Sequence, residues 1–314
     1  KSNKSDSYDI RYQGSVFTDA TWKVAFGLNY NHSFDDGYAY HAVDSLKAHR
    51  YRVNYNADAS YKRDLLSTYV NVQKHFSQTR LNWITSYSRA KDKQVLDADF
   101  TYHDVFQNGK ESKQDLITQE INYQSSRGDK IDWTVGTFGF YKDLTNDYLA
   151  TFGTERHLLL PLDLDQALYY NNTSTWGIAG YGQITVKNLL PGMFVTAGIR
   201  YDYEKASLSY RDSLLFHDAD RFTGYHDWDE KHSYAAWLPK FSVLQKWNEQ
   251  LSTYLNISKG YKAGGYNIIS NEMTTQVVEL EYDKESLWNY ELGAKYFSVN
   301  GRFNVNGALF YIDW

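Results

Sequence analysis

The amino-acid sequence predicts an all-β protein, an antiparallel transmembrane β-barrel to which this chain contributes about 12–14 strands. Apolar and polar residues alternate along most of the 314 residues, which gives each strand one apolar face and one polar face. Short turns alternate with long connections, as they do when one rim of a barrel carries turns and the other carries loops. Aromatic residues make up 17% of the chain, with 29 Tyr and 9 Trp, which suits the two aromatic girdles of such a barrel.

The composition excludes several other classes of protein. No segment approaches the roughly 18 consecutive apolar residues of a membrane-spanning helix. The mean hydropathy of −0.63 does not argue against a barrel, because alternation hides an apolar face from any average along the chain. With 0 Cys there are no disulfides or thiolate metal sites, and with 3 Pro few backbone N–H groups are lost from a ladder. The net charge of −5 argues against a nucleic-acid partner.

Strands are predicted in order along the first part of the chain. The clearest one begins at Trp22, where Trp22, Val24, Phe26, Leu28 and Tyr30 alternate with smaller or polar residues and place an aromatic ring at each end of the apolar face. Residues 32–46 form either a short turn or an extended loop. The segments predicted as strands are 8–17, 22–30, 51–55, 66–72, 81–87, 117–123 and 131–141.

The same pattern continues to the last residue. Strands are predicted at 175–187, 193–205, 233–246, 251–259, 285–297 and 302–314. Asn300-Gly301 is the dipeptide best suited to the positive φ angles of a tight hairpin turn. Long polar loops are predicted at about 90–115, 144–173 and 206–232, with a further long connection near residue 272.

Several phrases, in order, resemble parts of a known family. They are LNWITSYSRAKDKQVLDADF (81–100), DLITQEINYQSS (115–126), TWGIAGYGQITV (175–186), VTAGIRYDYEK (195–205), SKGYKAGGYN (258–267), WNYELGAKY (288–296) and FNVNGALFYIDW (303–314). Together they resemble the barrel of TonB-dependent outer-membrane receptors from about residue 65 onward.

This resemblance implies a larger barrel of about 22 strands with a plugged lumen. Residues 1–314 would then be a partial barrel, without the family's N-terminal plug domain or its C-terminal strands. It also implies a Gram-negative outer-membrane location, lipid contact, and active import of a scarce nutrient energised by the TonB–ExbB–ExbD system through the plug. A ferric siderophore is the expected ligand. Cobalamin, haem, nickel and oligosaccharides are other substrates in the family, and the sequence does not choose among them.

Ligand-binding residues are expected in the external segments, where aromatic and charged groups could grip a ligand. The candidates are Arg221, Tyr225, Trp228, Tyr261, Lys262, Tyr266 and Asn267. Gly260, Gly264 and Gly265 are interpreted as letting the chain bend where it leaves the barrel rather than as ligand contacts. The 206–232 segment is rich in His and carboxylates, but their spacing is not that of a metal site, so we expect a solvated loop, with no metal and no cofactor.

The predicted inner face carries Tyr181, Tyr254 and Phe138, which could meet a plug or a substrate. It also carries charged residues that we expect to pair with each other or with a plug: Arg200, Asp202, Glu204, Glu291 and Lys295.

Two other classes of function stay open. One is a passive porin complete at 314 residues, for which the terminal Trp314, with Phe310 and Ile312 at alternate positions, resembles a barrel-insertion signal. The other is a barrel enzyme of the lipase or protease type. The sequence has no Ser/His/Asp spacing, phosphate-binding glycine loop or zinc signature that supports catalysis. We therefore expect that this protein is not an enzyme.

Overall fold

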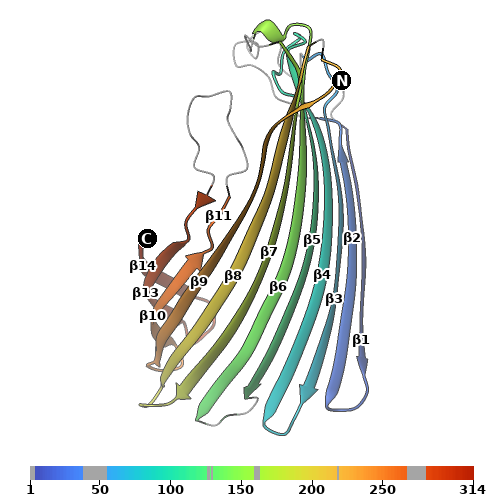
Figure 1. Cartoon of the computed structure of the whole chain (residues 1–314). Coiled ribbons are helices and arrows are strands. Elements are labelled where there is room, and N and C mark those ends of the chain that lie inside the picture. Colours follow the sequence, from blue (N-terminus) through green and yellow to red (C-terminus); the bar gives the residue numbers. More distant parts are fainter. Residues whose placement is uncertain are drawn as a thin grey trace.

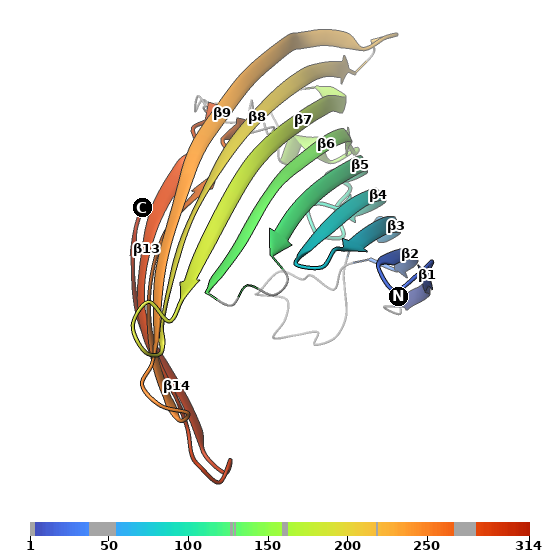
Figure 2. The same ribbon diagram turned by 90° about the horizontal axis from the view of Figure 1, so that it is seen from below.

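The computed structural model shows one curved antiparallel sheet of 12 strands, with the order β1-β2-β3-β4-β5-β6-β7-β8-β9-β10-β13-β14 (Figures 1 and 2). The structure describes residues 4–37, 55–125, 128, 130–158, 163–217, 219–266 and 281–314. Seen from below, the sheet follows an arc from β1 to β14, as part of a barrel wall does (Figure 2). The predicted partial antiparallel barrel is therefore confirmed.

The strands run from one end of the chain to the other with almost continuous pairing between neighbours. Their bounds are β1 (Ser5–Phe17), β2 (Trp22–Asp35), β3 (Ser60–His75), β4 (Thr79–Asp97), β5 (Phe106–Ser125), β6 (Ile131–Phe152), β7 (Leu164–Lys187), β8 (Met193–Phe216), β9 (Thr223–Lys246), β10 (Leu251–Lys262), β13 (Glu285–Phe297) and β14 (Asn304–Asp313). A short 3₁₀ helix, η1 (Arg156–Leu158), follows β6. The two-residue strands β11 (Gly265–Tyr266) and β12 (Glu281–Tyr282) pair as a separate ribbon between β10 and β13.

Short turns occupy one rim of the sheet, the lower rim in Figure 1, as the sequence predicts. The turns whose residues are all described span 18–21, 76–78, 188–192, 247–250 and 298–303. In the last turn Gly301 has φ +67, and Asn300 instead accepts hydrogen bonds through its side chain from Ser298 Oγ (2.8 Å) and Arg302 N (3.1 Å). The glycine of the predicted dipeptide therefore supplies the positive φ, while the asparagine closes the turn with its amide oxygen.

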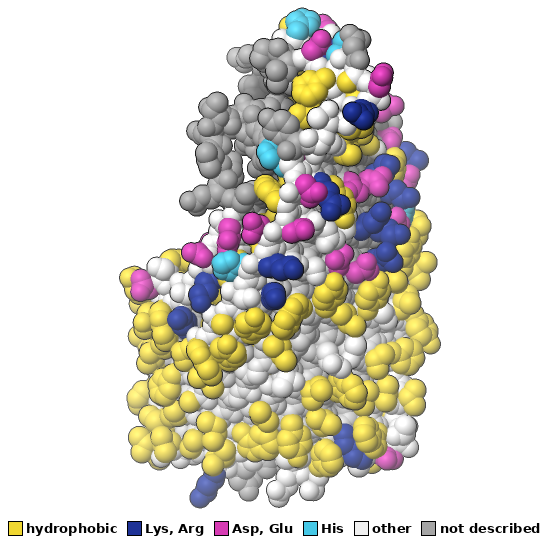
Figure 3. All heavy atoms as spheres, in the orientation of Figure 1, with side chains coloured by type: hydrophobic (Ala, Val, Ile, Leu, Met, Phe, Trp, Pro, Cys, Tyr) yellow, Lys and Arg dark blue, Asp and Glu magenta, His cyan; other side chains and the backbone are white. Residues whose placement is uncertain are grey.

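The lower part of the outer face is apolar. Hydrophobic side chains form a band there, and charged side chains gather above it (Figure 3). Ile178 and Ile199 are exposed on this face, with aromatic pairs such as Trp176–Tyr203 and Tyr201–Trp237 near the upper limit of the band. Such a band, with aromatic rings at its border, is what a lipid-facing barrel wall presents. Among the described residues, no helix is long and apolar enough to cross a membrane.

The predicted loops at 90–115, 144–173 and 206–232 are largely strand. Strand β4 reaches Asp97 and β5 starts at Phe106, while β8 and β9 continue to Phe216 and from Thr223. Strands β7, β8 and β9 have 24 residues each, about twice the 9–11 that a tilted strand needs to span a bilayer. The excess lies above the apolar band, where water faces the outer side and the outward residues become polar.

Opposite charges are found on directly paired residues in this upper part. On the outer face Lys93 faces Glu111 (2.7 Å) and Arg211 faces Asp227 (3.2 Å). Arg63 and Asp92 (2.6 Å) pair on the concave face, because Asp92 precedes Lys93 in the same strand. Cross-strand pairs of this kind stabilise a ladder in water. The strand predicted at 51–55 falls, apart from Tyr55, outside the described residues, and Tyr55 is not in a strand.

The upper connections are tied to one another by side chains. Asp104, after β4, accepts hydrogen bonds from Thr154 N (2.9 Å) and Thr154 Oγ1 (3.0 Å) after β6. Glu155 accepts one from Asp104 N (2.9 Å) and pairs with His103 Nδ1 (3.0 Å). The hydrogen bonds from Thr154, backbone first, lower the pKa of Asp104. The two connections therefore form one hydrogen-bonded unit at the upper rim.

Candidate functional site

The concave face of the sheet carries the polar and aromatic side chains that could meet a ligand. On β8, even-numbered residues such as Asp202, Ala206 and Tyr210 are buried, whereas the odd-numbered Ile199 and Tyr201 are exposed on the lipid side. Residues directly opposite each other in the register share a face. The concave residues of β8 therefore identify the concave residues of β6, β7 and β9 as well. The candidate site is built from these concave residues above and beside the apolar band.

A network of charged and phenolic groups lies on the concave face of β5, β7, β8 and β10. Arg200 binds Asp202 through two hydrogen bonds, both 2.7 Å, and its guanidinium also lies over the ring of Phe138 at 5.7 Å. Tyr261 donates to Glu204 Oε1 (2.7 Å). The predicted pairing of the inward charges is thus observed for Arg200 with Asp202, while Glu204 is satisfied by a tyrosine.

Two more tyrosines make the same kind of bond. Tyr181 donates to Glu120 (2.5 Å), and Tyr254 donates to Glu291 (2.5 Å) and lies beneath Lys295 at 5.8 Å. Phenol–carboxylate bonds hold a carboxylate in place without neutralising it, so the concave face keeps negative charge.

The ribbon of β11 and β12 packs against the upper part of β9. A Cβ on Gly264 would lie 2.6 Å from the ring of Tyr234 and would also meet the carbonyl oxygen of Tyr282. A Cβ on Gly265 would lie 2.5 Å from the Tyr282 hydroxyl. Lys284 Nζ donates to Ala235 O (2.7 Å) and holds the end of the ribbon to β9. The two glycines therefore permit close packing of the ribbon, in addition to the change of direction that we expected of them.

A second cluster lies higher on the concave face of β6 to β9. The ring of Trp228 packs on Tyr210 with 4.6 Å between centroids, and Tyr210 is only 1% exposed. Below the rim, Asp212 accepts from His226 N (2.7 Å) and pairs with His226 Nδ1 (2.9 Å). Asn146 donates to Asn171 (3.0 Å) in the same buried row. Tyr210 and Asp212 are buried in this cluster, and Trp228 is its partly exposed aromatic group.

The seven predicted binding residues occupy different parts of the molecule. Tyr261 and Tyr266 lie near Tyr234, at the ribbon end of the concave face. Trp228 lies in β9 in the second cluster rather than in a loop, because the predicted 206–232 loop is mostly strand.

The other four contribute less to one site. Lys262 is exposed and faces Glu285 at 3.5 Å. Arg221 is exposed in the connection between β8 and β9, which is distant in sequence from the ribbon. Tyr225 belongs to β9, its side chain lies outside the description, and Asn267 lies outside the described residues.

Sequence reasoning missed Tyr234, Glu281 and Glu120 as members of these clusters. Tyr234 shares the parity of His232 on β9, so a strand begun ten residues earlier would have placed both on the concave face. Glu281 lies in a ribbon that only the folded chain brings to β9. The polar and aromatic groups of the concave face are of the kinds that bind and orient a polar ligand.

Comparison with known proteins decides the family. Residues 1–314 match the family described as TonB dependent receptor-like, beta-barrel. The chain belongs to this family. Its members are transporters rather than enzymes and lie in the outer membrane of Gram-negative bacteria, in agreement with the location and the non-enzymatic role predicted from the sequence.

Solved structures of receptors share the fold at low sequence identity. The ferric yersiniabactin uptake receptor FyuA from Yersinia pestis is 17% identical with a TM-score of 0.78, and the match covers 99% of this chain and 45% of FyuA. The siderophore receptor PiuA from Acinetobacter baumannii is 12% identical with a TM-score of 0.70, over 98% of this chain and 50% of PiuA. The ferric citrate transporter FecA is 15% identical with a TM-score of 0.69, over 99% and 43%. The chain thus spans about half the length of these receptors.

Proposed function

We propose that this chain is part of a larger closed barrel with a plug on its concave side. The described sheet supports this, because β1 and β14 each have one neighbour in it. Unpaired N–H and C=O groups along a sheet edge are costly in lipid, where no water can satisfy them. Further strands would pair both edges. The charged and phenolic groups of the concave face suit contact with a polar plug.

The parent protein is proposed to be a receptor for active import of a scarce nutrient, a ferric siderophore, driven by the TonB–ExbB–ExbD system through the plug. The observation that carries this is the family match over the whole chain. The three receptors described above are named for ferric yersiniabactin, for a siderophore and for ferric citrate, which favours an iron complex as the ligand.

The binding surface is proposed to include Tyr261, Tyr266 and Trp228, with Arg221, Tyr225, Lys262 and Asn267 as further members. The support for the first three is their position on the concave side or its ribbon, beside other aromatic groups. Aromatic anchors in a concave, partly dry surface contribute most of the binding free energy in many complexes. Trp228→Ala is expected to weaken ligand binding by about tenfold or more.

An oligosaccharide is the second candidate ligand, ahead of cobalamin or haem. The partly exposed ring of Trp228 on the concave face favours it, since sugars pack their C–H faces on aromatic rings. A passive pore is the other alternative.

Uptake by the full-length parent protein tests these proposals. Cells with TonB intact or deleted are given labelled ferric siderophores, and abundance of the protein in the outer membrane is compared with and without iron. TonB-dependent uptake of an iron complex and higher abundance without iron are expected. Unchanged uptake of every iron complex would rule out the siderophore, and TonB-dependent growth on an oligosaccharide would support the second candidate. Ion conductance without TonB would support a pore.

A further inference from the structure

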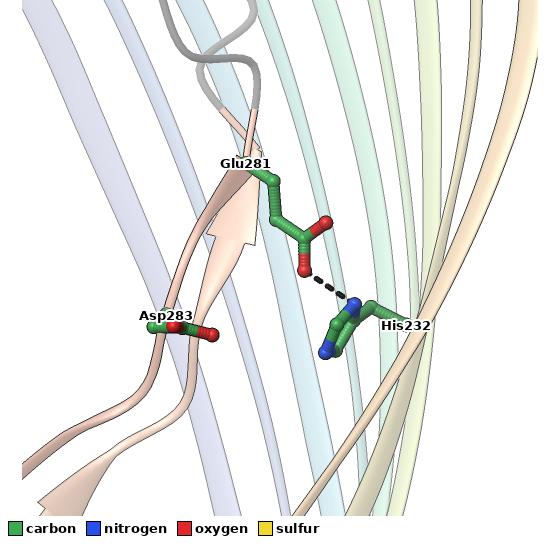
Figure 4. A group of neighbouring side chains, drawn as sticks. All are labelled: His232, Glu281 and Asp283. Carbon is green, nitrogen blue, oxygen red and sulfur yellow. Dashed lines mark ion pairs between the residues drawn. The ribbon is translucent and has the colours of Figure 1, made fainter.

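The ribbon brings two carboxylates onto a histidine of the barrel wall. Glu281 and Asp283 come from β12 and the residues after it, and His232 comes from β9 (Figure 4). One ligand atom from each of the three side chains lies within 4.8 Å of the others. His232 Nδ1 forms an ion pair with Glu281 Oε1. Within the described part of the chain, this is the one group of three such residues with atoms so close together.

A buried tyrosine beside this group gives a second, independent observation. The ring of Tyr234 stacks on the His232 ring with 4.8 Å between centroids. Tyr234 is 3% exposed, and in the part of the molecule that the structure describes its hydroxyl has no hydrogen-bond partner. A buried hydroxyl without a partner costs about 1–3 kcal/mol, so such groups commonly face a bound water or ligand. Tyr234 also contacts the ribbon, through the close approach of Gly264.

We propose that His232, Glu281 and Asp283 bind a divalent transition-metal cation of the Zn²⁺ class, which joins the ribbon to the wall. An imidazole nitrogen with two carboxylate oxygens is a donor set suited to Zn²⁺, whereas Ca²⁺ and Mg²⁺ take oxygen ligands alone. In a tetrahedral site with bonds of about 2.1 Å, neighbouring donor atoms lie about 3.4 Å apart, so donor atoms now within 4.8 Å of one another would need to approach by at most about 1.4 Å. A water in the fourth position could accept the hydrogen bond of the Tyr234 hydroxyl.

The role of such a site is to fix the ribbon of β11 and β12 against β9. Lys284 and the two glycines already hold the ribbon near the wall, and the cation would add a bond between two elements that share no ladder. The inference does not depend on which nutrient the receptor imports. The proposed site also differs from a metal site within the 206–232 segment, because its two carboxylates come from the ribbon.

The test uses the full-length receptor purified in detergent and Zn²⁺ as the probe. Titration against a chromophoric chelator is expected to show one saturable site, with affinity reduced roughly tenfold or more in His232→Gln and in Glu281→Gln. Co²⁺ bound to the same site is expected to give visible absorption bands that both variants lose. Tyr234→Phe is expected to leave the stoichiometry unchanged and to lower the affinity by a smaller factor.

His226→Gln is the matched control, since His226 lies on the same face of β9 and also pairs with a carboxylate, that of Asp212. It is expected to bind Zn²⁺ as the unaltered receptor does. Heat-modified gel mobility shows that each variant is folded. The proposal is overturned if the unaltered receptor has no saturable site, or if folded His232→Gln and Glu281→Gln variants bind Zn²⁺ with unchanged affinity.

Discussion

The lower and upper halves of the same strands differ in their outer side chains and agree in their backbone pairing. On β8, Ile199 is 51% exposed in the apolar band, and Arg211, on the same face, has a 61% exposed side chain opposite Asp227. The ladder with β7 runs through both halves, with a single shift near Leu164. The backbone therefore satisfies its hydrogen bonds in the same way in lipid and in water, and the surrounding medium selects the side chains.

The inner face changes less between the two halves. Arg200 with Asp202 lies beside the apolar band, and Asp212 with His226 lies near the rim. Both pairs face the concave side, where charged groups are partnered beside the apolar band and near the rim. The contrast between lipid and water thus concerns the outer face alone, and the inner face can serve binding along its whole length.

The largest expected effect comes from placing a charge in the apolar band. Ile199→Arg is expected to destabilise the full-length barrel in lipid vesicles by about 2–4 kcal/mol, because the guanidinium would face hydrocarbon. Urea unfolding in vesicles, followed by tryptophan fluorescence, measures the free energy of unfolding.

Ser209→Arg is the matched control. Ser209 lies on the same face of the same strand, opposite Asp229 and above the band. We expect a change within about 0.5 kcal/mol, of either sign. Equal losses for the two variants would contradict the assignment of the band to lipid.

The next effect concerns the inner face. Tyr261→Phe removes the hydroxyl that donates to Glu204 at 2.7 Å and leaves a carboxylate with one donor fewer. The expected loss is about 1–3 kcal/mol in the free energy of unfolding, as for other hydrogen bonds to charged groups. In the double variant Tyr261→Phe with Glu204→Gln, the second change is expected to cost less than Glu204→Gln alone. Strictly additive losses in this cycle would show that the two groups do not interact.

A pH effect is expected at the upper rim. Hydrogen bonds from Thr154 lower the pKa of Asp104, so this carboxylate stabilises the link between the two connections above its unfolded pKa of about 3.9. The link is lost as the pH falls through the lower folded value. Hydrogen exchange at the Thr154 amide, compared with exchange at the same pH in Asp104→Asn, is expected to show protection at pH 6 that decreases toward pH 3 in the unaltered protein only. The same pH dependence in both would assign the change to another group.

The sequence predicted the strands of the apolar band because lipid on one side enforces strict alternation. Trp22 to Tyr30 shows this clearly, and β2 contains it whole. Above the band the outer face is polar, so the apolar outer residues that mark the lower strands are absent. From Ala206 to Arg211 the alternation is reversed: Ala206, Leu208 and Tyr210 are buried on the concave side, and the residues between them face outward. The segment up to Phe216 is still fully paired with β7. The predicted loop boundaries were wrong in these extensions for that reason.

The binding surface could be predicted only in part. Tyr261 was found because it follows a strand and precedes the glycines, and Glu204 was placed on the inner face by its parity. That one donates to the other depends on the meeting of β8 and β10 across β9, which no spacing along the chain encodes. The approach of Glu281 to His232 depends likewise on how the ribbon folds back.

The smallest expected effect comes from the outer salt bridges of the upper half. Arg211 and Asp227 have side chains 61% and 68% exposed, so water and salt screen their attraction. Arg211→Ala is expected to lower the free energy of unfolding by less than about 0.5 kcal/mol, and the difference should vanish in 1 M NaCl. Arg200→Ala provides the contrast, because Arg200 bonds Asp202 twice on the concave face and covers Phe138. Its loss is expected to exceed that of Arg211→Ala and to persist at high salt. If both losses were equal and equally salt-dependent, the Arg200–Asp202 pair on the inner face would be as well solvated as the Arg211–Asp227 pair on the outer face, and the distinction between the two faces would not hold.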